Sequence, residues 1–169
     1  MDSDSFLRLF DDHHLPLFRF AYRMTGSVAD AEDVVQECFL ELLRPGCSYD
    51  PKRTPIRIYL FGVVRNQSLK RLAKAGPAGD EVQQVWNGRS PEGEVLRTEM
   101  EQVVARAVRQ LPEGQREALI LAHYEQMPLA EIAGVMGIEV TAVKSRLQRA
   151  RGQLKETLAA YAVSPERKR

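Results

Sequence analysis

The sequence has few of the residues that cross-link small secreted proteins or bind metals. Of its 169 residues only two are cysteine, Cys38 and Cys47, and only three are histidine. Neither cysteine has another Cys or a His at ligand spacing, which argues against a disulfide framework and against a structural zinc site. We therefore expect no metal, no cofactor and a reducing, cytoplasmic environment.

Long apolar runs and an excess of one charge are also missing. No apolar run approaches the roughly 18 residues that a membrane-spanning helix needs. The N-terminus, MDSDSFLRLFDDHH, is acidic and lacks the basic start of a signal peptide. The formal net charge is +1, so composition alone indicates neither nucleic acid nor membrane. We expect a soluble protein without membrane insertion, whose electrostatic partners are set by local charge.

The motifs that usually mark a catalytic site are absent as well. The sequence has no glycine-rich phosphate loop, no nucleophile elbow and no HExxH. His13 and His14 are adjacent, and His123 is far from them in sequence, so histidine gives no evident metal or catalytic cluster. We expect no enzymatic activity.

What the sequence does contain is helical periodicity in two halves, with no alternating strand pattern. Between the halves, AGPAGDEVQQVWNGRSPEG is rich in Gly and Pro and shows no helical period. Trp86 within it is either docked on a domain or ordered in the groove of a partner. The predicted fold is all-α, with two small helical domains (1–74 and 94–161), a flexible linker (75–93) and a basic tail (162–169).

Two helices of opposite charge are predicted in the N-terminal half. Ala29–Leu43 is amphipathic, contains five acids and no base, and has Ser27 as a candidate N-cap. Ile56–Lys74 contains five bases and no acid. The two helices can simply attract each other, although exposed ion pairs contribute only about 0–1 kcal/mol each. Unbroken single-sign faces more often indicate separate partners.

The C-terminal half predicts a helix-turn-helix. Leu129–Met136 forms a short apolar helix, Gly137 supplies a left-handed C-cap, and a longer helix follows from Val140. On a helical wheel at about 100° per residue, the second helix has an apolar stripe opposite a polar ridge with cationic shoulders. The ridge suits base edges and the shoulders suit phosphates, as in a DNA-reading helix. The ridge comprises Thr141, Ser145, Gln148 and Arg149, and the shoulders comprise Lys144, Arg146 and Arg151.

The sequence as a whole resembles a bacterial RNA polymerase sigma factor of the extracytoplasmic-function (ECF) group. The resemblance rests on segments in the family's order: DAEDVVQECFLELL, FGVVRNQSLKRL, LPEGQREALILAHYEQMPLAEIAGVMG and VTAVKSRLQRARGQLKETL. The last two also occur in other helix-turn-helix regulators. The first two, joined by a linker to that C-terminal domain, are much more specific.

The resemblance implies a promoter-specificity subunit and the partners of each helix. The acidic helix would bind the clamp of polymerase core, and the C-terminal domain would lean on the flap. The basic helix would bind the −10 element, the C-terminal helix would read the −35 element, and an anti-sigma protein would silence the chain. The core contacts carried over are Asp33, Gln36 and Glu37, and the −10 contacts are Arg65, Asn66, Lys70 and Arg71.

The sequence departs from the family pattern at three places, and two other functions remain open. One departure is Pro45-Gly46, which ends the acidic helix early. At Ile56 and Tyr59 the family often has an aromatic residue and then Trp. The predicted DNA-reading helix, which follows from Val140, begins with Thr141 and Ala142, where the family usually has Gly. The alternatives are a stand-alone helix-turn-helix regulator and a signalling adaptor that binds proteins through its acidic helix. In the sigma-factor reading, the family favours a linker that orders on its partner around Trp86.

Overall fold

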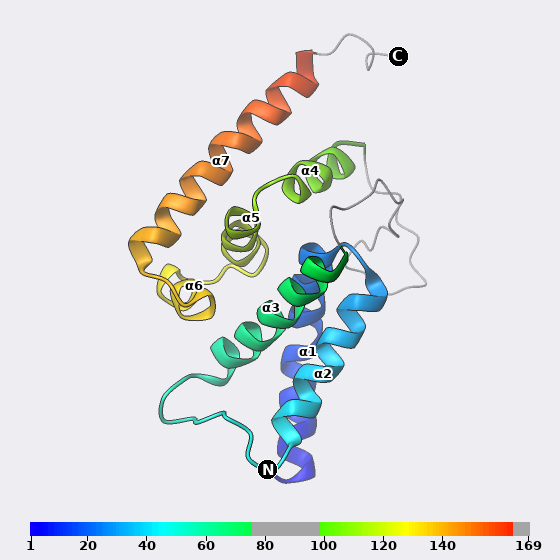
Figure 1. Ribbon diagram of the computed structural model, residues 1–169, viewed down its shortest axis with the longest axis vertical. Helices are drawn as coiled ribbons and strands as arrows, with labels where there is room; N and C mark the ends of the chain where they lie inside the picture. The colour runs from blue at the N-terminus through cyan, green and yellow to red at the C-terminus, as the bar shows by residue number, and fades with distance from the viewer. Residues whose placement is uncertain (76–98, 164–169) are drawn as a thin grey trace.

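A computed structural model of the chain describes residues 1–75 and 99–163, and these residues form helices only (Figure 1). The predicted all-α class is confirmed. The helices are α1 (Ser3–Thr25), α2 (Val28–Leu43), α3 (Ile56–Ala75), α4 (Glu99–Arg109), α5 (Glu113–Leu119), the π-helical turn η1 (Ile120–Tyr124), α6 (Leu129–Met136) and α7 (Val140–Val163).

Helices α1, α2 and α3 pack together around a core of large apolar side chains. Phe20 of α1 and Phe61 of α3 are buried, with ring centroids 5.6 Å apart. Helix α1 ends at Gly26, whose φ of 72° is the left-handed C-cap that lets the chain reverse at once into α2. Ser27 caps α2 as predicted, because its hydroxyl accepts a hydrogen bond from the backbone N–H of Asp30 at 3.2 Å.

Helices α4 to α7 form the second group, and its helix-turn-helix agrees with the sequence pattern. Helix α6 spans the predicted Leu129–Met136 and ends at Gly137 with φ 65°. Val143, Leu147 and Ala150 of α7 are buried, as the wheel predicts. Helix α7 continues to Val163, so it includes the first two residues of the segment 162–169 that was predicted as a basic tail. Residues 164–169 lie outside the described ranges.

The two groups of helices pack against each other, chiefly through α3 and α6 (Figure 1). Helix α3 therefore has neighbours on two sides, because α1 and α2 cover another of its faces. Ala75, predicted as the first linker residue, is the last residue of α3. The rest of the predicted linker, including Trp86, lies outside the described residues.

Two glycines offer a matched test of this description. Neither Gly137 nor Gly152 has an atom within 4 Å of an added Cβ, so substitution acts through the backbone alone. Gly137→Ala should destabilise the fold by about 1–2 kcal/mol, because φ 65° disfavours an L side chain. Gly152→Ala, inside α7, should stabilise it by about 0.5–1 kcal/mol. Urea unfolding of both variants measures the difference, and equal midpoints would contradict the assigned cap.

Candidate functional site

The outer face of α2 presents acidic and polar side chains to solvent. The side chains of Asp33 and Glu37 are 59% and 48% exposed, and Gln36 is also exposed. The helical period places these three residues on one side of α2, while Val34, Cys38 and neighbouring apolar residues face the core. The residues predicted to bind core polymerase therefore share one accessible surface.

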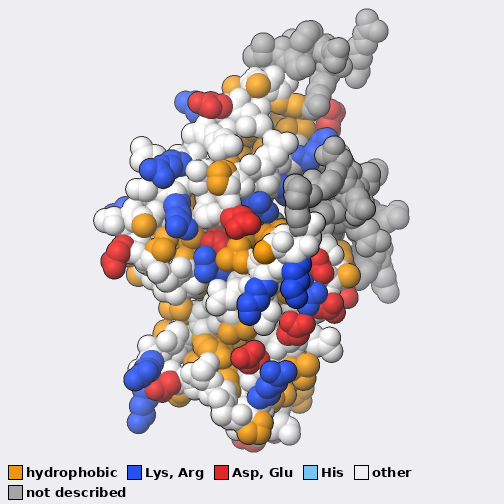
Figure 2. Space-filling view, viewed as in Figure 1, with side chains coloured by type: hydrophobic (Ala, Val, Ile, Leu, Met, Phe, Trp, Pro, Cys, Tyr) orange, Lys and Arg blue, Asp and Glu red, His pale blue; other side chains and the backbone are white. Residues whose placement is uncertain are grey.

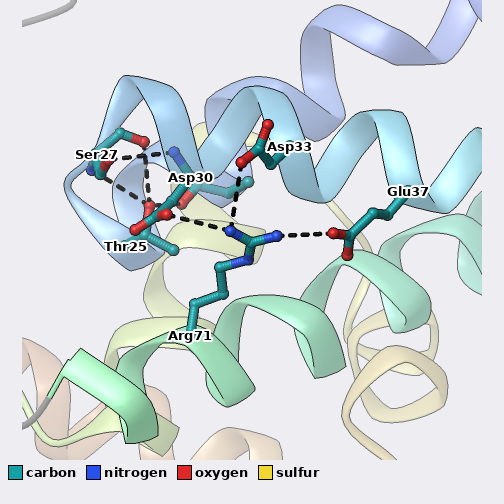
Figure 3. A network of polar contacts seen from close by, with 7 residues as sticks. Thr25, Ser27, Asp30, Asp33, Glu37 and Arg71 are labelled. Atoms are coloured by element: carbon teal, nitrogen blue, oxygen red, sulfur yellow. Dashed lines mark hydrogen bonds and ion pairs between the residues drawn. The ribbon is translucent and has the colours of Figure 1, made fainter.

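The same surface already has a cation from α3 lying across it (Figure 3). The guanidinium of Arg71 donates to Glu37 at 2.8 Å, to Asp30 at 3.3 Å and to Asp33 at 3.5 Å. The attraction between the acidic and basic helices that the sequence left open is thus present in the fold. Arg71, predicted to contact the −10 element, is held by α2 in this conformation.

A second predicted −10 residue, Arg65, is engaged on the other side of α3. Its Nε donates to Oε1 of Glu117 in α5 at 3.0 Å. Glu117 is only 1% exposed, and its Oε2 has no hydrogen-bond partner among the described residues. Burial raises the pKa of Glu117, and the nearby guanidinium of Arg65 opposes that rise.

The four predicted −10 residues therefore do not form one free surface. Asn66 and Lys70 are exposed, whereas Arg65 and Arg71 are held by carboxylates on different helices. Sequence reasoning did not identify Glu117 as a partner, because the residues of this pair are far apart in sequence and no local pattern joins them. The only hint was that Glu117 directly precedes the apolar stretch ALILA.

Other contacts join the two groups of helices. Arg57 of α3 pairs with Glu131 of α6 at 2.9 Å and donates to the backbone oxygen of Glu125 at 3.2 Å. Arg116 of α5 donates to the backbone oxygen of Met24 at 2.9 Å, near the C-terminal end of α1. These contacts position α5 and α6 against α1 and α3.

The polar ridge of α7 is exposed, as the wheel predicts. Thr141, Ser145, Gln148 and Arg149 all face solvent, as do the shoulder residues Lys144 and Arg151. Figure 2, in the view of Figure 1, shows Lys and Arg side chains along the surface over α7. The arrangement can present hydrogen-bonding groups to base edges with cations beside them.

Arg146 differs from the other predicted −35 residues. It is only partly exposed, and its guanidinium lies over Gly114 of α5. A Cβ added to Gly114 would stand 2.7 Å from Nη1 of Arg146, so the missing side chain makes room for the guanidinium. The charge of Arg146 also lowers the pKa of Glu117, against the larger effect of burial. The structure thus separates Arg146 from the outward-facing set.

Tyr49, in the loop between α2 and α3, lies close to Tyr59 of α3. The rings of Tyr49 and Tyr59 lie 5.0 Å apart, and the Tyr59 hydroxyl is 3.5 Å from the sulfur of Cys47.

Across residues 1–75 and 99–163, no three or more His, Cys, Asp or Glu residues lie close enough together to hold a metal ion. No helix in those ranges is long and apolar enough to span a membrane.

Comparison with known proteins places this geometry in a family. Residues 9–77 match the family model described as Sigma-70 region 2, and residues 101–154 match that of Sigma-70, region 4. The ECF RNA polymerase sigma factor SigL of Mycobacterium tuberculosis is 34% identical over 160 residues, covering 92% of this chain and 90% of SigL. SigW of Bacillus subtilis is 29% identical over 170 residues, covering 93% and 90%.

Solved structures agree over both groups of helices. CnrH, solved in complex with the cytosolic domain of CnrY, gives a TM-score of 0.72 at 28% identity, covering 94% of this chain and 90% of CnrH. RpoE of Bartonella quintana, solved with the anti-sigma factor NepR, gives 0.71 at 25% identity, covering 92% and 97%.

Two helical domains that match regions 2 and 4 define a sigma-70-type transcription initiation factor. The chain belongs to the ECF group of sigma factors. It is a promoter-specificity subunit of RNA polymerase, and neither alternative left open by the sequence is favoured.

The Arg71 cluster leads to a stability prediction. Arg71→Met leaves the carboxylates of Asp30, Asp33 and Glu37 without their shared cation, so unfolding should become easier by about 1 kcal/mol. Added salt should reduce this loss of stability, because salt screens the repulsion among the remaining acids. Lys74→Met, at an exposed position on the same helix, is the control. Urea unfolding at two salt concentrations measures the stability of both variants. The same stability and the same salt dependence in the two variants would contradict the role of the cluster.

Proposed function

We propose that residues 1–74 bind polymerase core and the −10 element, and that residues 94–161 read the −35 element. The observation that carries this proposal is the exposed polar ridge of α7 in a chain that also matches sigma region 2. The protein acts in the cytoplasm and has no catalytic activity of its own. CnrH and RpoE were each solved with a protein partner, which supports an anti-sigma protein as a further partner here.

The core contact is assigned to Asp33, Gln36 and Glu37. Support comes from their exposure on α2 and from the resemblance of this helix to the family segment that meets the polymerase clamp. Arg71 neutralises part of this face, but the side chains of Asp33 and Glu37 remain about half exposed. A basic surface on the polymerase can therefore approach the same carboxylates from the solvent side.

Charge reversal tests this assignment. Asp33→Lys combined with Glu37→Lys should weaken core binding by about tenfold or more, because like charges at an interface cost several kcal/mol. The control is Asp11→Lys with Glu32→Lys, which makes the same change in net charge at exposed positions outside the assigned contact. Both are measured by core titration, with circular dichroism to confirm folding. Equal affinity of the two folded variants would refute the assignment.

The −35 contact divides into three roles along α7. Arg149, with Thr141, Ser145 and Gln148, lies on the ridge that faces base edges. Arg151 lies on a shoulder suited to a phosphate, and Lys144, near the start of the helix, can reach either target. Arg146 orients α7 against α5, because its guanidinium is seated over Gly114.

These roles predict different outcomes in run-off transcription from a −35 library with core enzyme. Arg149→Ala should relax preference at one base pair, at a cost of about 1–3 kcal/mol. Arg151→Ala should weaken all sequences alike and lower the salt slope by about one. Arg146→Ala should reduce activity without lowering that slope. The division fails if all three variants lose activity uniformly with the same slope, and the proposed function fails if the unmodified chain yields no promoter-dependent transcript.

A further inference from the structure

Arg71 joins residues that are assigned to two different partners. Two of the carboxylates that hold its guanidinium, Glu37 at 2.8 Å and Asp33 at 3.5 Å, belong to the proposed core contact. Arg71 itself is one of the residues predicted to bind the −10 element. The third carboxylate, Asp30 at 3.3 Å, belongs to neither set. One ion-pair network within the N-terminal domain therefore contains groups from both proposed binding sites.

The carboxylates of this network are open to solvent. The side chains of Asp30, Asp33 and Glu37 are all more exposed than that of Arg71, which is 26% exposed. Figure 3 shows the guanidinium reaching from α3 across to α2, where it meets the carboxylates. Each carboxylate offers about four acceptor positions on its two oxygens. A second cation can therefore approach Asp33 and Glu37 while Arg71 is still bound.

A second cation on these two carboxylates weakens their hold on Arg71. Positive charge beside Asp33 and Glu37 repels the guanidinium and competes with it for the same oxygens. Asp30 then remains as a partner through one contact of 3.3 Å. The charge of Asp30 is also stabilised without Arg71, because it lies in the first turn of α2, where the helix dipole favours an acid. Arg71 is thereby freed to leave α2.

The exposed side of α3 lies next to the freed arginine. Lys70 directly precedes Arg71, Asn66 lies about one turn earlier, and both are exposed. Successive residues are separated by about 100° around a helix, so the long side chain of Arg71 can turn from α2 toward these two residues. A DNA phosphate at this surface that draws Arg71 away also leaves Asp33 and Glu37 less neutralised. The two carboxylates then attract a basic surface more strongly.

We propose that Arg71 couples the binding of polymerase core to the binding of the −10 element. Core bound at Asp33 and Glu37 frees Arg71 for the DNA backbone, and DNA bound at Arg71 strengthens the core contact. By thermodynamic linkage the two effects are equal in size. This inference rests on the proposed function and adds that its two N-terminal sites act together.

Removing the shared cation should strengthen core binding in the absence of DNA. Arg71→Met should bind core about threefold more tightly than the unmodified chain, because Asp33 and Glu37 lose their intrachain cation. An arginine that only held α2 in place would give weaker core binding when removed. Lys74→Met, with the same charge change at an exposed position on α3, is the control and should leave core affinity unchanged. Core titration measures both, and circular dichroism confirms folding.

The coupling itself is measured as the gain in core affinity that DNA produces. The probe is a promoter fragment that supports run-off transcription, added at saturation, with a shuffled fragment as the blank. The gain should be about threefold smaller for Arg71→Met than for the unmodified chain. Lys70→Met removes an exposed −10 residue outside the cluster and should keep the full gain. Arg71→Gln keeps hydrogen-bond donors for α2 without the charge, so it should behave like Arg71→Met and replaces that variant if it folds poorly.

The outcomes separate failure of the coupling from failure of the sigma function. The coupling is overturned if a folded Arg71 variant binds core no more tightly than the unmodified chain. It is also overturned if Lys70→Met reduces the gain from DNA as much as Arg71→Met does. If the unmodified chain neither binds core nor yields a transcript with it, the proposed function itself is wrong. The expected result is tighter core binding and a smaller gain from DNA in the Arg71 variants alone.

Discussion

The rest of the structure depends on the packing of helix α3, which contacts α1 and α2 on one side and α6 on another. Phe61 joins α3 to the aromatic core of the N-terminal domain, while Ile58 on another side meets α6. The guanidinium of Arg71 pairs with carboxylates of α2, and the guanidinium of Arg65 pairs with a carboxylate of α5. The helix that we propose binds the −10 element is thus paired with carboxylates from two other helices of its own chain.

These ion pairs differ in what they contribute. The Arg71 cluster is partly exposed, so solvent screens each of its bonds and the three carboxylates keep room for another partner. The pair of Arg65 with Glu117 lies deeper, where removing one partner leaves a buried charge uncompensated. The first arrangement is compatible with binding at an exposed surface. The second requires the domains to separate before Arg65 can meet another anion.

Local features of the fold were predictable from the sequence, and contacts between distant segments were not. Ser27 and Gly137 signal helix ends through local chemistry, and the wheel placed the buried and exposed sides of α7 because periodicity needs no tertiary partner. The pairing of Arg65 with Glu117 depends on how two domains meet. The position of the Arg146 guanidinium likewise depends on the missing side chain of Gly114 in another helix. The helical wheel used only the angle of Arg146 around α7 and therefore assigned this residue to a phosphate contact.

If residues 1–74 and 94–161 bind the −10 and −35 elements at the same time, the packed arrangement of the two domains must open on a promoter. The most direct measurement is the distance between spin labels on Lys74 of α3 and Lys155 of α7, both exposed, in a chain with its native cysteines replaced. We expect one narrow distance distribution for the free chain and a longer distance when core polymerase and promoter DNA are bound. The same distance in both states, or a broad distribution in the free chain, would contradict it.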